Sequence, residues 1–512
     1  MLVKTHGAAL YGISAMLVTV EVHLTNGIQF LMVGLPDSAV KESQQRVKTA
    51  IESIGHRWPG KSITVNMAPA DLRKEGAAYD LPFAMGLLAA TQNVPAHRVS
   101  RFLIMGELSL DGEIREVKGA LPMALLAKKQ GLEGIILPTK NAPEAAVVDG
   151  LKAYGFDHLS DVVKFFHNEK DFEAIELDTK QLFLEKLNDF PLDFRDVKGQ
   201  ENIKRAFEIA AAGGHNLILI GPPGAGKTML AKRLPTILPP LNLDESLETT
   251  KIQSVAGKVP KKDPLVTQRP FRAPHHTISD VALVGGGQFP QPGEISLAHN
   301  GVLFLDELPE FKRQVLEVMR QPLEERQVTI SRARFSVDFP ASMMLIAAMN
   351  PCPCGYHNHP VKACQCPAPT VQRYLNKVSG PLLDRIDIHV EVTPVSFDEL
   401  SEKPTSERSA EIRRRVIEAR RIQEERYADK NGLHCNALLA SRDLKTYCAL
   451  DASCMSMLKQ AMKKLQLSAR AYDRILKVSR TIADLDGKEC IGLSHLAEAI
   501  NYRSLDREDW GD

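Results

Sequence analysis

Alternating apolar and polar positions over residues 1 to about 165 predict an α/β domain. ITVNMAP (63–69) and GIILPT (134–139) have the pattern of strands. AVKESQQRVKTAIESIG (39–55) and LPFAMGLLAATQ (81–92) have the spacing of helices. Strands and helices that alternate in this way are typical of an α/β fold.

The apolar run ALYGISAMLVTVEVHL near the start of the chain is interrupted by Glu21 and His23, and no small-residue cleavage site follows it. We interpret it as strands rather than as a signal peptide or a membrane span. The eight cysteines, without a secretion signal, argue against a disulfide framework. These features predict a cytoplasmic protein with no membrane partner.

The pattern changes twice further along the chain. Between residues 167 and 193 the charge is higher and the periodicity weaker, which indicates a linker between domain 1–166 and the rest. From 194 to 395 apolar strands alternate with helices, the pattern of a parallel sheet covered on both faces. From 396 to 512 the pattern is almost wholly helical. Three domains fit a chain of 512 residues, because a domain has roughly 100 to 200 residues.

Net charge gives no general reason to bind nucleic acid, because 64 Lys and Arg are balanced by 63 Asp and Glu. The arginine-rich segment ERSAEIRRRVIEARRIQEERY (407–427) has glutamates interleaved at three- and four-residue spacings. That spacing favours a solvated helix face over a DNA-binding helix. Any binding of nucleic acid must therefore come from local basic loops.

NLILIGPPGAGKTML (216–230) combines a buried strand, a glycine-rich loop and the start of a helix, which is the arrangement of a phosphate-binding loop. The glycines let backbone N–H groups turn toward phosphate oxygens at a helix N-terminus. Lys227 adds a positive charge for the outer phosphates, and the Thr228 hydroxyl can ligate Mg²⁺. The residues expected to contact ATP here are Gly221, Pro222, Pro223, Gly224, Ala225, Gly226, Lys227, Thr228 and Met229.

Two later strands end in polar residues that complement this loop. GVLFLDELPE (301–310) places Asp306 and Glu307 after four apolar residues. We expect Asp306 to hold Mg²⁺ through water, and Glu307 to orient and deprotonate the attacking water. MLIAAMN ends in Asn350, which could hold that water near the γ-phosphate, although an Asn at a strand end is more often a turn former.

These nucleotide motifs, with Asn350 and SGPLLDRIDIHVEV (379–392), resemble AAA+ ATPases of the helix-2-insert clade, which includes magnesium chelatase ATPase subunits and minichromosome maintenance helicases. Longer motifs span nearly the whole chain and resemble the bacterial ComM (YifB) family of magnesium-chelatase-like proteins. The resemblance implies a central AAA+ domain with a parallel sheet and a C-terminal helical lid. The longer motifs are GLPDSAVKES, VNMAPADLRKEGAAYDLP, RPFRAPHHTIS, NPCPCG and LSARAYDRILKVSRTIADL.

The resemblance also implies roles for three arginines. Arg385 in LLDRID would be an arginine finger that reaches into the nucleotide site of a neighbouring subunit, a contact that contributes roughly 10³ to 10⁵ in rate in nucleotide hydrolases. Arg470 in LSAR would be the second sensor, on the lid, with Arg474 as the alternative. Either of these two could instead be a surface ion-pair partner. A finger that acts in trans implies a ring, and the ring expected for this family is a homo-hexamer.

EERQVTISRARFSVDFP (324–340) has alternating runs on both sides of Ser331 to Arg334, which predicts a hairpin before the strand that ends in Asn350. Arginines at an exposed hairpin tip are usually only solvated, but the hairpins of ring ATPases of this clade project toward the channel and engage DNA backbone phosphates. Arg332 and Arg334 are therefore candidate DNA contacts.

A second insert contains RPFRAPHHTIS and offers four basic or titratable side chains: Arg269, Arg272, His275 and His276. Contact with DNA or a neighbouring subunit, and a purely structural role, are equally open interpretations of this insert.

The first domain resembles the proteolytic domain of Lon proteases, whose active form uses a serine nucleophile and a lysine base. Pro122 stands where the lysine is expected, and KEGAAYDLP, where the nucleophile is expected, contains no serine or threonine. A hydroxyl nucleophile needs both its oxygen and a base. We therefore expect an inactive domain that serves as a scaffold or substrate-binding collar.

NPCPCGYHNHPVKACQCP places two C-x-C pairs nine residues apart, directly after the strand that ends in Asn350. Four thiolates suit tetrahedral structural zinc and leave no open position for catalysis, although the two-residue gap of ordinary zinc fingers is absent. Reduced, unligated cysteines are the alternative. The expected ligands are Cys352, Cys354, Cys364 and Cys366.

The leading hypothesis is a hexameric ATPase that encircles DNA and moves junctions, which the resemblance implies because the ComM family acts in branch migration during integration of transforming DNA. The alternative is a magnesium-chelatase-like ATPase that does not act on DNA. Such a machine works with a partner bearing an integrin-like D-x-S-x-S site, which this chain lacks. An ATP-dependent protease is opposed by the missing serine and lysine.

Overall fold

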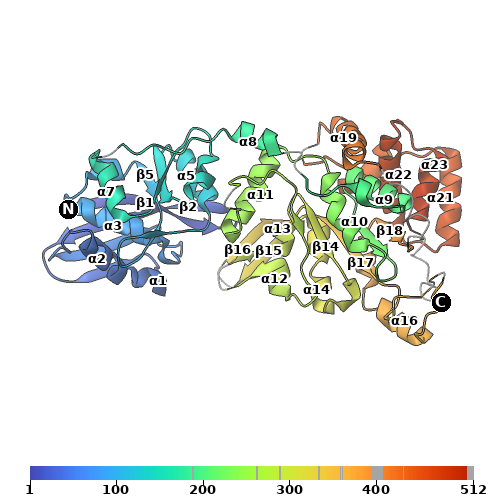
Figure 1. The fold of residues 1–512 in the computed structure, drawn as a ribbon, viewed down its shortest axis with the longest axis horizontal. Helices are drawn as coiled ribbons and strands as arrows, with labels where there is room; N and C mark the ends of the chain where they lie inside the picture. Colours follow the sequence, from blue (N-terminus) through green and yellow to red (C-terminus); the bar gives the residue numbers. More distant parts are fainter. Residues whose placement is uncertain are drawn as a thin grey trace.

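The chain forms three parts in a row along its long axis in the computed structural model (Figure 1). The N-terminal α/β part lies at one end, the second α/β part in the middle and the helical C-terminal part at the other end. Among the described residues, no helix combines the length and the hydropathy needed to cross a membrane. The structure describes residues 1–169, 171–186, 190–260, 263–287, 290–332, 335–357, 359, 361–394, 407–430 and 432–503.

The N-terminal part is built on a seven-stranded mixed sheet. The pairs β1–β2 and β2–β4 are antiparallel, and the other pairs are parallel. In sheet order the strands are β3 (Phe30–Val33), β4 (Ser62–Ala68), β2 (Ser14–Thr25), β1 (Leu2–Tyr11), β5 (Phe102–Ile104), β8 (Gly134–Pro138) and β9 (Lys152–Phe156). Its main helices are α1 (Ser38–Lys41), α2 (Ser43–Ser53), α3 (Asp80–Ala90), α5 (Ala120–Lys129), α6 (Ala142–Ala146) and α7 (Leu159–His167).

The strands and helices predicted for this part are confirmed, except that the helix expected over 39–55 is divided at Glu42 into α1 and α2. The α3 helix is buried on all sides, because its sequence is apolar around its whole circumference. Pro122 lies buried in the first turn of α5.

The segment predicted as a linker over 167–193 is in large part docked on the N-terminal sheet. Ile175 donates its N–H to the carbonyl of Ala153 in β9 at 2.9 Å. Phe172 and Phe183 pack against the same core, the latter from α8 (Thr179–Lys186). The few apolar side chains in this charged segment are partly buried against the first domain, which therefore includes residues beyond 166.

The central part contains the predicted parallel sheet, with all four strand pairs parallel. Its strands, in order, are β11 (Phe271–Arg272), β14 (Val302–Leu305), β17 (Met344–Met349), β10 (Leu217–Ile220) and β18 (Ile388–Glu391). The helices include α9 (Glu201–Gly213), α10 (Lys227–Arg233), α11 (Leu243–Ala256), α12 (Asp280–Val284), α13 (Glu294–Leu297), α14 (Arg313–Glu317), α15 (Arg320–Glu325), α16 (Ala368–Leu375) and α17 (Gly380–Leu383).

The predicted hairpin is present before β17, as β15 (Gln327–Arg332) and β16 (Phe335–Pro340). The turn between β1 and β2 rests on it, because the Tyr11 hydroxyl donates to the carbonyl of Ser336 at 2.8 Å. A second contact joins the domains where Gly119, before α5, donates its N–H to the carbonyl of Ser254 in α11 at 3.0 Å. The N-terminal domain thus contacts both the hairpin and α11.

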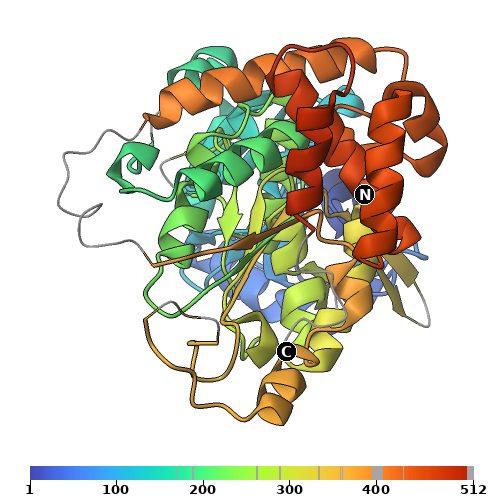
Figure 2. The ribbon, with the colours of Figure 1, turned by 90° about the vertical axis from the view of Figure 1, so that its right-hand side faces the viewer.

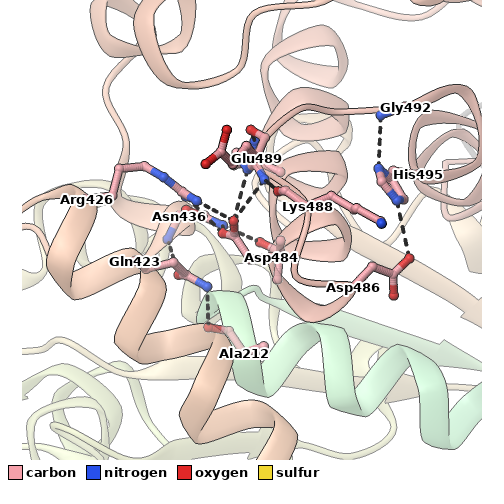
Figure 3. A network of polar contacts seen from close by, with 12 residues as sticks. Ala212, Gln423, Arg426, Asn436, Asp484, Asp486, Lys488, Glu489, Gly492 and His495 are labelled. Carbon is pink, nitrogen blue, oxygen red and sulfur yellow. Dashed lines mark hydrogen bonds and ion pairs between the residues drawn. The ribbon is translucent and has the colours of Figure 1, made fainter.

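The C-terminal part is helical, as predicted, and its helix α19 lies along α9 of the central part (Figure 2). A buried polar network holds it together (Figure 3). Asp484 accepts hydrogen bonds from Arg426 and Asn436 at 2.9 Å each, and Gln423 of α19 donates to the carbonyl of Ala212 in α9 at 3.2 Å. The helices are α19 (Ser409–Arg426), α20 (Ser441–Tyr447), α21 (Ala452–Lys464), α22 (Ala469–Leu485) and α23 (Leu493–Asn501).

The expectation that the arginines of α19 form a solvated face is wrong for part of the helix. Arg421 is exposed and pairs with Glu418 and Glu425, as expected. Arg413 and Arg420, however, are only 8% and 9% exposed. Their guanidinium groups donate to backbone carbonyls in the loop after α10 and near the end of α9, which compensates for their burial.

Candidate nucleotide-binding site

The glycine-rich loop lies between the carboxyl end of β10 and the start of α10 at Lys227. Gly224 and Gly226 have φ angles of 78° and 84°, in the left-handed region where a side chain would be strained. A Cβ on Gly221 would lie 2.3 Å from the carbonyl oxygen of Val392, so the chain after β18 packs directly on the loop. The loop therefore requires glycine at these three positions for physical reasons.

Lys227 is 8% exposed, and its ammonium group meets three oxygen atoms. It donates to the carbonyls of Gly221 and Pro222 at 2.6 and 2.9 Å and to Oδ1 of Asn350 at 3.0 Å. Burial lowers the pKa of Lys227, while Asp306 and Glu307 act in the opposite direction. The strand order explains these neighbours, because β17 lies between β10 and β14 and all three strands end at the same edge.

Asp306 and Thr228 face each other across this edge. The Thr228 hydroxyl donates to Oδ2 of Asp306 at 2.6 Å, and the other carboxylate oxygen accepts the N–H of Glu307 at 2.9 Å. A hydroxyl and a carboxylate that meet at one edge of a sheet are the oxygen ligands that Mg²⁺ takes beside nucleotide phosphates. This donor set fits Mg²⁺.

Glu307 has a neighbour that the sequence did not identify. Its backbone has a φ of 53°, and its carboxylate lies 3.3 Å from Nδ1 of His276, while 57% of its side chain is exposed. The rings of His276 and His275 are in contact, tilted by 34° with their centroids 4.1 Å apart. The short strand β11 lies just before the two histidines in the sequence. Because β11 pairs with β14, it brings both histidines to the sheet edge where the acids lie, so recognising this strand would have predicted the contact.

The cysteine loop follows Asn350 and rests on the glycine-rich loop. A Cβ on Gly355 would lie 2.4 Å from Cδ of Pro223, so the two loops touch. The sulfur atoms of Cys352, Cys354 and Cys364 are 3.3 to 3.6 Å apart. With Cys366, all four lie within 4.8 Å of one another. Tetrahedral zinc with Zn–S bonds of about 2.3 Å would place sulfur atoms about 3.8 Å apart, so this donor set fits structural zinc.

Three segments of the chain each match a family model of the ChlI subunit of magnesium chelatase. Residues 193–400 match the family described as magnesium chelatase, subunit ChlI; residues 20–141 match subunit ChlI of Mg-chelatase; and residues 406–503 match the C-terminal region of that subunit. The chain is 46% identical over 506 residues to the competence protein ComM of Haemophilus influenzae, which covers 98% of this chain and 97% of that protein. The chain belongs to the ComM family.

Membership in the ComM family makes the chain a magnesium-chelatase-like AAA+ ATPase, a class that uses ATP and Mg²⁺. The chain is also 45% identical over 508 residues to the uncharacterized protein YifB of Salmonella typhimurium, with 98% of this chain and 97% of that protein covered. A stretch of 160 residues is 31% identical to Lon protease 2 of Bacillus subtilis and covers 28% of each chain. This match is consistent with the Lon-like fold expected for the N-terminal domain.

The arginines to which the resemblance gives roles pair with acids outside the nucleotide cluster. Arg385 is 5% exposed, and its guanidinium lies 2.6 Å from the Glu324 carboxylate and also donates to the carbonyl of Pro381. Its Nε is buried without an acceptor among the described residues. In this chain, therefore, Arg385 is held by its own subunit.

The two candidates for the second sensor lie on α22 and pair with acids of the DRID sequence. Arg470 is 53% exposed and lies 3.7 Å from Asp384, whereas Arg474 is 20% exposed and lies 2.9 Å from the buried Asp387. Burial would raise the pKa of Asp387, but Arg474 and His215 lower it well below its ordinary value. Both arginines thus join the lid to the segment before β18.

Among the arginines considered as DNA contacts, Arg269 has a structural role, which was one of the two interpretations of this insert. It donates to the carbonyls of Pro239, Pro240 and Asn300 and to the Glu245 carboxylate. Arg272 makes a two-pronged ion pair with Glu294 at 2.6 and 2.8 Å. Arg334 and the side chain of Arg332 lie outside the described residues.

Proposed function

We propose that this protein is an ATP-driven motor that acts on DNA as a hexameric ring and moves DNA junctions. The observation that carries the ATPase chemistry is the convergence of Lys227, Thr228, Asp306, Glu307 and Asn350 at one edge of the central sheet. The DNA substrate is inferred from kinship, because a full-length relative at 46% identity is named a competence protein.

Within this proposal the backbone N–H groups of the loop and Lys227 bind the β- and γ-phosphates of ATP. A phosphate oxygen would replace one of the carbonyls that Lys227 now contacts. Thr228 and Asp306 would hold Mg²⁺, which neutralises charge on the phosphate oxygens.

Glu307 is the proposed general base, and Asn350 the group that positions the attacking water. As the water oxygen bonds to the γ-phosphorus and the bond to ADP breaks, the water proton passes to the Glu307 carboxylate. His276 holds that carboxylate at 3.3 Å, so it acts as a positioning residue for Glu307.

Arg385 is the proposed finger, and it can serve a neighbouring subunit only if its ion pair with Glu324 opens. Contact with a neighbouring subunit that opens the Arg385–Glu324 ion pair would therefore also allow ATP hydrolysis in that neighbour. Arg470 is the proposed second sensor, and its contact with Asp384 at 3.7 Å would have to open before it could reach bound nucleotide.

We also propose that Cys352, Cys354, Cys364 and Cys366 hold one structural zinc ion. The support is the spacing of the four sulfur atoms and the contact between Gly355 and Pro223. Zinc would thus fix the backbone between Asn350 and the surface that supports the glycine-rich loop.

A magnesium-chelatase-like function without DNA is the second candidate, because the three matching family descriptions all name the chelatase subunit. Steady-state ATPase rates with and without four-way DNA junctions separate the two. The motor account predicts a DNA-stimulated rate, and a rate indifferent to DNA at every concentration would favour the chelatase-like account.

A further inference from the structure

A cavity lies at the opposite edge of the central sheet from the nucleotide site. Its floor is formed by Gly214, Gly301 and Met344, at or just before the amino ends of β10, β14 and β17. Its other wall comes from the C-terminal part, where Arg420 of α19 and His434 face the sheet. The cavity offers about 70 Å³ to water-sized molecules, roughly five times what one water needs.

Three arginines line this cavity, and they come from separate segments of the chain. Arg269 precedes β11, Arg326 follows α15, and Arg420 lies on α19. Among the described residues, Glu245 is the only carboxylate that lines it, and it pairs with Arg269 at 3.1 Å. A guanidinium does not lose its proton in proteins, so two positive charges remain without a carboxylate in the wall.

Two of the arginines keep N–H groups available for a ligand. Arg326 donates one hydrogen bond, to the carbonyl of Met343 at 2.6 Å. Arg420 donates through Nε and one terminal nitrogen to the carbonyls of Ala212 and Ala211. Among the described residues, the other nitrogens of these two groups have no protein acceptor.

The pKa of His434 is lowered by its burial and by the positive charges around the cavity. Burial first, and then Arg420, Arg269 and Arg326, lower its pKa to about 4, whereas Glu245 acts in the opposite direction. The imidazole is therefore neutral at pH 7 and can donate or accept a hydrogen bond beside the arginines.

We propose that this cavity binds a small tetrahedral oxyanion of the phosphate type, held by Arg326 and Arg420. Guanidinium groups bind such anions through paired N–H bonds, and a dianion would compensate the two unmatched charges. The small volume of the cavity fits a compact anion rather than a nucleic-acid strand. So does the burial of its arginines, since Arg269 is 14% and Arg420 9% exposed. The bound anion ties α19 to the sheet, so it stabilises the docking of the C-terminal part.

The test must separate this site from the glycine-rich loop, which also binds phosphate. Equilibrium dialysis of radiolabelled inorganic phosphate is therefore performed on the full-length Lys227→Ala protein at constant ionic strength. We expect saturable binding of one phosphate per chain, competed by sulfate and not by a short DNA duplex. Lack of saturable binding, or competition by the duplex, would overturn the proposal.

Two further variants in the Lys227→Ala background locate the bound ion. Arg326→Gln removes one arginine, and Ser342→Asp places a carboxylate in the cavity wall, where it should compete with the anion and keep the protein folded. Both should weaken phosphate binding at least tenfold, and Arg421→Gln, on the exposed face of α19, should not. Phosphate binding that survives both cavity variants would show an adventitious ion only.

Discussion

Lys227 donates a hydrogen bond of 3.0 Å to the amide oxygen of Asn350, which joins the glycine-rich loop to the end of the neighbouring strand β17. The same strand end leads into the cysteine loop, and Gly355 of that loop touches Pro223. The phosphate-binding lysine, the residue proposed to position water and the proposed zinc site are therefore neighbours in space as well as in sequence.

Replacing Lys227 with alanine should abolish detectable ATP binding. The variant loses a charged donor to the outer phosphates, and each hydrogen bond to a charged group contributes about 1.5 to 3 kcal/mol. Titration with a fluorescent ATP analogue measures the loss. Wild-type affinity in the variant would show that nucleotide binds elsewhere.

Glu307→Gln should bind ATP normally and hydrolyse it at least a hundredfold more slowly, because a neutral amide cannot accept the proton of the attacking water. His276→Gln should lower kcat by a smaller factor and leave ATP affinity unchanged, since it disturbs only the position of Glu307. Both are measured by single-turnover hydrolysis. A normal rate for Glu307→Gln would refute the assignment of the base.

The purified protein should contain one zinc ion per chain, measured by plasma mass spectrometry. Cys364→Ser should reduce the zinc content and lower the melting temperature, because a structural ion contributes its binding energy to folding. Cys490→Ser is the matched control, since Cys490 is exposed and outside the cluster. Full-length protein that is folded, active and free of zinc would contradict the zinc proposal.

Arg474→Ala should destabilise the protein by about 3 to 5 kcal/mol, because it leaves the buried Asp387 carboxylate without its main partner. The exposed Arg470→Ala should cost less than about 1 kcal/mol. Denaturant unfolding compares the two. Equal losses would show that the pair with Asp387 has no special role in stability.

The same pair predicts a dependence on pH. The pKa of Asp387 in the folded protein is lowered, so its stabilising effect is complete above the ordinary aspartate pKa of about 4. The effect is lost as pH falls below that value toward the folded-state pKa. Acid unfolding curves of wild type and Asp387→Asn should therefore converge at low pH.

The sequence predicted that these residues meet because the glycine-rich loop, the acid pair and Asn350 each follow an apolar strand, and the carboxyl ends of parallel strands share one edge. It did not predict the contact of His276 with Glu307, which depends on β11 being placed beside β14. It also missed the burial of Arg420. The glutamates around that residue are spaced as on a solvated helix, and only the docking of α19 on α9 decides which arginines face inward.

The central claim is that ATP hydrolysis at this site moves DNA. The most direct test is dissociation of a labelled four-way DNA junction by the purified protein with ATP and Mg²⁺, with the Glu307→Gln protein in parallel. The account predicts ATP-dependent dissociation by the wild type and none by the variant. An active ATPase that leaves the junction intact and hydrolyses ATP at the same rate with and without DNA would contradict it.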